Sequence, residues 1–251
     1  MLGDLRAETV RLRGAGGDEI EAYQAVPLDD GLRGGSYGGV VVIHHMPGYD
    51  EGTKEITRRF AAHGYAAVCP NLYTREAPGA DPDDAAATAR ANGGVPDDRL
   101  VGDVAGAAAH RRGLPGSNGR VATIGYCSGG RQSVLAALST DLDAAVDCYG
   151  AFVTGTPPEG FPLQVSPLTD RLGDLRCPVL GLFGAEDRYP SPEHVAEFEA
   201  ALQRLGKEHE FHSYEGAGHS FFSTDRPAYR PEAATDGWQR IFAFLARHLQ
   251  G

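Results

Sequence analysis

The residue best suited to covalent chemistry in this sequence is Cys127. It lies in residues 125–130, Gly-Tyr-Cys-Ser-Gly-Gly, which follow an apolar run and precede a helical pattern. A reactive residue flanked by glycines between a strand and a helix is the pattern of a nucleophile elbow. Gly125 and Gly129 have a steric purpose there, because the sharp turn brings these positions too close to other backbone for a side chain. The segment therefore predicts a cysteine nucleophile.

Two other interpretations of this turn are open. Ser128 could be the nucleophile, but centring the pattern on it places Tyr126 where a small residue is required. Cys127 could instead be a small buried residue, the usual fate of a free cysteine and the one we expect for Cys148. We prefer Cys127 as nucleophile, because the N-terminus of a helix stabilises the reactive thiolate.

The partners of a nucleophile in an elbow follow it in the order acid, then base. After the apolar run 179–183 the chain reads Gly-Ala-Glu-Asp, and Asp187 lies nearer the apex of that turn than its competitor Glu186. We therefore assign Asp187 as the acid. His219 stands in a glycine-rich loop after the strand-like residues 211–214, where a general base is required, and its pairing with Cys127 follows the logic of Cys–His activation.

The other eight histidines occupy less suitable places. His44 and His45 are neighbours at a strand end, where side chains point to opposite faces, so they do not readily share a metal ion. We expect neither a metal nor a cofactor. The remaining histidines lie in helical, polar or strand contexts: His63, His110, His194, His209, His212 and His248.

The elements that must position these residues alternate between short β-branched runs and longer helical patterns. This alternation predicts an α/β protein with a mostly parallel sheet covered by helices on both faces, the α/β-hydrolase fold. Nearly continuous apolar runs indicate strands buried on both faces. The expected strands are residues 40–44, 66–69, 121–125, 144–149 and 179–183. The expected helices are residues 54–63, 99–112, 133–138, 192–205 and 231–249.

The remaining segments follow other patterns. Alternation in the first 35 residues predicts an antiparallel edge hairpin. Residues 77–98 and 153–170 show no period and are expected to be either lids or loose loops.

Composition limits the class of protein. A chain of 251 residues, 41% of them hydrophobic, is expected to form one domain, residues 1–251. The formal charge of -11 and the lack of basic runs argue against nucleic acid as a partner. No apolar stretch is long enough to span a membrane and no signal peptide is evident, so we expect a cytoplasmic protein. Four isolated cysteines suggest neither disulfides nor zinc.

Several segments together resemble the dienelactone hydrolase family. They are the motif around Cys127, residues 67–73 (Ala-Val-Cys-Pro-Asn-Leu-Tyr), the turn at Asp187, and residues 218–221 (Gly-His-Ser-Phe). The similarity spans about residues 38–245. It implies a cofactor-independent hydrolase with Cys127 as nucleophile, which opens enol lactones such as carboxymethylenebutenolide.

Two positions depart from the family pattern. His45 stands where the family has a glutamate that takes the proton of the cysteine, so we expect His45 to accept that proton or, when protonated, to hold the thiolate, with a structural loop histidine as the alternative. The family binds the substrate carboxylate with two arginines. Arg75 matches one, whereas Ser223 replaces the other and Arg226 follows three residues later. We assign Arg75, His45 and Tyr126 to substrate binding.

The oxyanion hole is expected from the backbone N–H groups of Ser128 and Met46. The leading hypothesis is a hydrolase that opens a small ester or lactone through a Cys127–His219–Asp187 triad. The alternatives are a broader carboxylesterase or thioesterase with the same triad, and a ligand-binding module in which Cys127 is unreactive. We expect a monomer or a homodimer.

Overall fold

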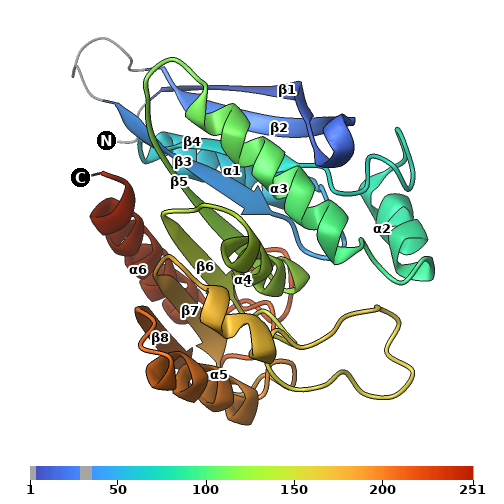
Figure 1. Ribbon diagram of the computed structural model, residues 1–251, viewed down its shortest axis with the longest axis vertical. Helices are drawn as coiled ribbons and strands as arrows, with labels where there is room; N and C mark the ends of the chain where they lie inside the picture. The colour runs from blue at the N-terminus through green and yellow to red at the C-terminus, as the bar shows by residue number, and fades with distance from the viewer. Residues whose placement is uncertain (1–3, 29–35, 251) are drawn as a thin grey trace.

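A single mixed sheet of eight strands runs through the described part of the chain, in the order β1-β2-β4-β3-β5-β6-β7-β8 (Figure 1). The computed structural model describes residues 4–28 and 36–250. Strands β3 to β8 run parallel to one another. Strands β1 and β2 form an antiparallel hairpin at one edge, and β2 pairs antiparallel with β4. The strands are β1 (Leu5–Arg13), β2 (Glu19–Pro27), β3 (Tyr37–Ile43), β4 (Ala66–Pro70), β5 (Ser117–Tyr126), β6 (Ala144–Cys148), β7 (Val179–Gly184) and β8 (His209–Tyr214).

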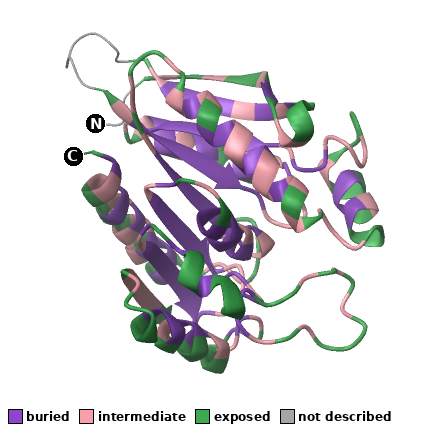
Figure 2. Cartoon of the chain, viewed as in Figure 1, coloured by how far each residue is buried: buried purple, intermediate pink, exposed green. Residues whose placement is uncertain are grey.

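The two faces of this sheet are covered by different helices. Helices α1 (Glu51–Ala62) and α6 (Pro231–Leu249) contribute to the core on one face. Helices α2 (Pro82–Ala91), α3 (Asp97–Arg112), α4 (Ser128–Ser139) and α5 (Pro192–Arg204) contribute to the core on the other. The interior strands β3, β4, β6 and β7 are almost entirely buried, whereas the edge strands β1 and β8 are not (Figure 2). The predicted α/β-hydrolase fold, with helices on both faces of a mostly parallel sheet, is confirmed.

Strand β3 shows how the sequence produces this arrangement. Val40 and Val42 belong to the core under α1 and α6, whereas Val41 and Ile43 belong to the core under α3 and α4. Successive side chains of a strand point to opposite faces, so a strand covered on both sides must be apolar at every position. The continuous apolar runs in the sequence therefore mark the interior strands correctly.

The predicted edge hairpin is confirmed, with Thr9 opposite Tyr23 in its register. Its turn contains the short 3₁₀ helix η1 (Ala15–Gly17). A second 3₁₀ helix, η2 (Thr169–Asp174), precedes β7.

Of the two alternatives expected for residues 77–98, the loose loop is wrong, because they contain helix α2. This helix buries only Ala85, Ala86 and Ala89. Alanine has a high helix propensity but little hydrophobic contrast with its neighbours, so the buried face of α2 is hard to recognise in the sequence.

No helix among residues 4–28 and 36–250 is both long enough and apolar enough to cross a bilayer.

Candidate active site

Cys127 occupies the turn between β5 and α4. Its backbone has φ 57° and ψ −124°, an unfavourable conformation for a residue with a side chain. Two hydrogen bonds hold it there: the N–H of Cys127 donates to the carbonyl of Cys148 at 3.1 Å, and the N–H of Gly130 donates to the carbonyl of Cys127 at 2.9 Å. The sulfur is thereby presented at the N-terminus of α4, at the carboxyl edge of the sheet.

Gly125 and Gly129 make this turn sterically feasible. A Cβ on Gly125 would lie 1.8 Å from the carbonyl oxygen of Gly129, and one on Gly129 would lie 2.4 Å from that of Ile43. Both distances are far shorter than any contact between a carbon and an oxygen in a protein. These close approaches are the physical reason for the glycine spacing in the sequence.

His219 and Asp187 come together from the loops after β8 and β7. Nδ1 of His219 lies 2.8 Å from Oδ2 of Asp187, whose side chain is only 1% exposed. The other oxygen of Asp187 accepts the N–H of Tyr189 at 2.9 Å, and Tyr149 packs edge-on against the His219 ring with the centroids 5.1 Å apart. The competing carboxylate of Glu186 is exposed.

The electrostatics of Cys127 and His219 are linked. Burial opposes ionisation of the Cys127 thiol, but a hydrogen bond and charge attraction from His219 outweigh it and lower the thiol pKa. Burial likewise opposes protonation of His219, yet hydrogen bonds to Asp187 and Cys127 raise its pKa to about 10. Both directions favour a thiolate next to an imidazolium. The backbone N–H groups of Ser128 and Met46 also donate to the sulfur and lower the thiol pKa further.

A cavity of about 380 Å³ opens in front of the sulfur. Cys127, Asp187 and His219 all line it. Its other walls are mostly apolar and come largely from segments predicted to be aperiodic. They include Val95, Phe152, Phe161, Leu163, Val165 and Tyr189.

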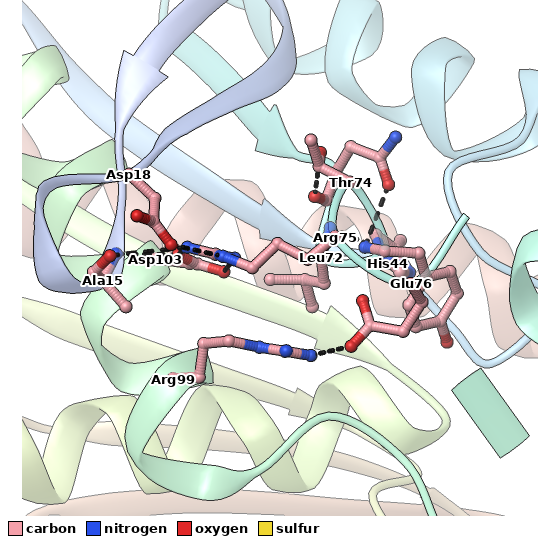
Figure 3. A network of polar contacts seen from close by, with 11 residues as sticks. Ala15, Asp18, His44, Leu72, Thr74, Arg75, Glu76, Arg99 and Asp103 are labelled. Carbon is pink, nitrogen blue, oxygen red and sulfur yellow. Dashed lines mark hydrogen bonds and ion pairs between the residues drawn. The ribbon is translucent and has the colours of Figure 1, made fainter. Parts of the chain in front are cut away.

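Arg75, which the sequence assigns to substrate binding, does not line this cavity. Its guanidinium makes two hydrogen bonds of 2.9 and 3.0 Å to Asp103, a fully buried carboxylate, and one of 2.8 Å to Asp18 (Figure 3). These carboxylates neutralise the arginine and direct it toward the hairpin turn at Ala15. The sequence motif gives the position of Arg75 after β4. It does not reveal the partners Asp18 and Asp103, which lie far from Arg75 in the sequence.

His45 and Tyr126 also lie outside the cavity with Cys127. Both line a second, smaller cavity of about 100 Å³, together with Ser223. Nε2 of His45 lies 2.7 Å from Asp50 at the start of α1, and the Tyr126 ring packs against Phe222. Tyr126 is the last residue of β5, so its side chain points into the core under α6, away from the cavity. The structure therefore does not bring His45 and Tyr126 together with Cys127 in one cavity, and their role in substrate binding stays a prediction.

Sequence reasoning missed most of the residues that shape the cavity. Arg90 and Arg188 line it and are exposed, and Gln132 on α4 has a buried side-chain oxygen without a hydrogen-bond partner among the described residues. The signal available in the sequence was that residues 77–98 and 153–170 are long and aperiodic, which is typical of loops around a site. Among the described residues, no three His, Cys, Asp or Glu side chains form a group that could hold a metal ion.

Comparison with known proteins identifies the family of this chain. The model of the dienelactone hydrolase family matches residues 20–249. A protein of Salmonella typhimurium named "Putative carboxymethylenebutenolidase" is 35% identical over 237 residues, which cover 92% of this chain and 84% of the relative. The carboxymethylenebutenolidase of Pseudomonas putida is 32% identical over 215 residues, which cover 82% of this chain and 84% of that protein.

Solved structures give the same result. A Klebsiella pneumoniae protein described as a "Putative Dienelactone Hydrolase" superposes with a TM-score of 0.84 at 30% sequence identity. The match covers 97% of this chain and 99% of that one. The chain therefore belongs to the dienelactone hydrolase family of hydrolases.

Proposed function

We propose that this protein hydrolyses a small ester or lactone through a thioester formed on Cys127. The thiolate attacks the carbonyl carbon, and the electron pair of the C=O bond moves to the oxygen. The N–H groups of Ser128 and Met46 stabilise that oxyanion. When the C–O bond breaks, His219 gives its proton to the leaving oxygen, which in a lactone stays attached to the acyl chain.

The second half of the reaction uses the same residues. Water attacks the thioester while His219 takes its proton, and the sulfur leaves as a thiolate with the acid product released. Asp187 orients the imidazole through Nδ1, so that Nε2 faces the sulfur and the substrate.

One observation carries this proposal: the His219 ring connects the carboxylate of Asp187 to the thiol of Cys127 at the wall of a cavity. These three side chains come from loops after three different strands. A structural cysteine or a simple binding pocket has no need of this arrangement. A non-catalytic binding module is therefore the weaker alternative.

Cys127→Ala tests the nucleophile directly. We expect hydrolysis of p-nitrophenyl acetate to fall by at least about 10³-fold, because no other side chain takes over the attack. Cys177→Ala, which changes a buried cysteine outside the cavity, is the control and should retain activity. A Cys127→Ala variant that hydrolyses esters at nearly the normal rate would rule the mechanism out.

The structure also favours a second candidate, a carboxylesterase for uncharged substrates with a bulky apolar group. Arg75 is engaged by Asp103 and Asp18, and the cavity is lined mainly by apolar side chains such as Phe152 and Phe161. Comparison of kcat/KM for a carboxylate-bearing enol lactone with that for uncharged aryl esters separates the two. Faster turnover of the uncharged esters would select the broader esterase.

A further inference from the structure

One peptide unit of the loop after β3 faces the sulfur of Cys127. The N–H of this unit belongs to Met46 and donates toward Cys127, and its carbonyl belongs to His45. Because a peptide bond is planar and trans, the two groups point in opposite directions. Whatever holds the carbonyl of His45 therefore also determines where the N–H of Met46 points.

Two donors hold that carbonyl. Nδ1 of His44 lies 2.9 Å from it, and the N–H of Gly48 donates to it at 2.9 Å. The hydroxyl of Tyr73 donates to the next carbonyl, that of Met46, at 2.9 Å. The peptide facing the sulfur is thus held from its far side.

The hydrogen bonds of His44 define its tautomer. The N–H of Leu72 donates to Nε2 of His44 at 3.2 Å (Figure 3). A main-chain amide nitrogen can only donate, so Nε2 carries no proton and Nδ1 does. Nδ1 is then the donor to the carbonyl of His45. The ring is 1% exposed, and burial lowers its pKa to about 4, so it is neutral at pH 7.

The segment that carries Leu72 is itself anchored to α3. Arg75 binds Asp103, and Glu76 pairs with Arg99 (Figure 3). The N–H of Leu72, which sets the tautomer of His44, therefore lies on an anchored segment. This anchoring fixes the orientation of the His44 imidazole.

We propose that His44 is a positioning residue for the oxyanion hole, which orients the His45–Met46 peptide so that its N–H meets the oxygen that becomes negative during attack. This inference rests on the proposed thioester mechanism. His44 does not line the cavity, so it acts on the substrate only through the peptide.

Two polar substitutions separate the two hydrogen bonds of His44. In His44→Asn the amide nitrogen lies about as far along the side chain as Nδ1 and retains the bond to the His45 carbonyl. In His44→Gln the amide oxygen lies about as far along as Nε2 and retains the bond from Leu72. We expect kcat for an aryl ester to fall about 10- to 100-fold in His44→Gln and only a few-fold in His44→Asn, with KM nearly unchanged in both.

Alkylation of Cys127 by iodoacetamide provides an independent readout, because that reaction forms no oxyanion. Its rate at pH 8 should stay within about three-fold of the unmodified protein in both variants, since His219 and the N–H of Ser128 still stabilise the thiolate when the N–H of Met46 is misaligned. Equal losses of kcat in the two variants, or a larger loss in His44→Asn, would overturn the positioning role. Parallel losses of hydrolysis and alkylation would do the same, because they indicate damage to the thiolate.

A third variant keeps the inference testable if His44 proves necessary for folding. Tyr73→Phe removes the bond to the Met46 carbonyl and should lower kcat with little change in alkylation. No loss of kcat would then contradict the inference. Failure of the proposed function itself is distinct, because Cys127→Ala would then retain hydrolysis.

Discussion

Nδ1 of His219 lies 2.8 Å from Oδ2 of Asp187, and this contact fixes which nitrogen of the ring faces Cys127. An ionised carboxylate can only accept, so Nδ1 must carry a proton. Nε2 is then left free to exchange protons with the thiol and the substrate.

Asp187→Asn should therefore lower kcat/KM strongly, by about 10²- to 10⁴-fold, because the amide can donate to Nδ1 and favour the wrong tautomer. Turnover of p-nitrophenyl acetate measures the effect. Glu186→Gln is the matched control and should stay within about two-fold, since that side chain is exposed. A larger loss of kcat/KM in Glu186→Gln than in Asp187→Asn would show that Glu186, not Asp187, is the acid.

Selective alkylation should reveal the lowered pKa of the Cys127 thiol. At pH 7 a larger fraction of Cys127 than of an ordinary cysteine is ionised to the thiolate. Iodoacetamide should therefore label Cys127 at least about 10-fold faster than the other cysteines. Cys69, Cys148 and Cys177 serve as internal controls, because burial raises the pKa of each. Peptide mass spectrometry after short exposures measures the ratio.

His219→Gln should move the alkylation profile of Cys127 to higher pH, because the hydrogen bond and charge that stabilise the thiolate are lost. The rate of labelling measured from pH 5 to 10 gives the midpoint. An unchanged midpoint would show that His219 does not control ionisation of the thiol.

Arg75→Met should lower stability and leave substrate selectivity unchanged. The substitution leaves the buried carboxylate of Asp103 without its cation, which costs about 3–5 kcal/mol of unfolding free energy. Asp18→Asn breaks only an exposed contact and should cost less than about 1 kcal/mol. Urea unfolding measures both. A selective loss of activity toward carboxylate-bearing substrates in Arg75→Met would return Arg75 to the substrate site.

Asp147 should make stability depend on pH. It is fully buried in β6, one oxygen accepts the N–H of Gly150 at 2.7 Å, and the other has no partner among the described residues. Burial raises its pKa to about 7, above the value of about 3.9 in an unfolded chain. Folding thus favours the protonated form of Asp147. The stabilisation that this protonation gives is fully present below about pH 4 and is lost as the pH rises through about 7.

Asp147→Asn should remove this dependence. The variant and the unmodified protein should have similar Tm values at pH 4, and the variant should be more stable at pH 8, by an amount on the order of a few kcal/mol. Asp141→Asn, at an exposed position, should show no such divergence. Equal Tm differences at both pH values would contradict a raised pKa.

The sequence predicts best what depends on neighbouring residues. The glycines around Cys127 and the loop positions of Asp187 and His219 follow from local steric and strand-end rules, and the structure brings these side chains together as expected. Interior strands are equally recognisable, because burial on both faces leaves a continuous apolar run.

The sequence predicts poorly what depends on distant partners. Arg75 fits a local motif, yet its direction is set by Asp103, which lies 28 residues later on helix α3. His45 is likewise turned away by Asp50. The cavity walls include residues of the alanine-rich α2 and of the aperiodic segment 153–170. These segments meet only in the folded chain, so no local sequence pattern predicts that they line a cavity.

Cys127 lies at the carboxyl ends of the parallel strands, whereas helix α6 ends near the opposite edge of the sheet (Figure 1). There the side chain of Asn118, near the start of β5, donates to the carbonyl of Leu249. A tether attached to the last residues would hold the molecule with its cavity facing away from the support. Immobilisation on beads through that end should therefore leave ester turnover close to that of the free protein.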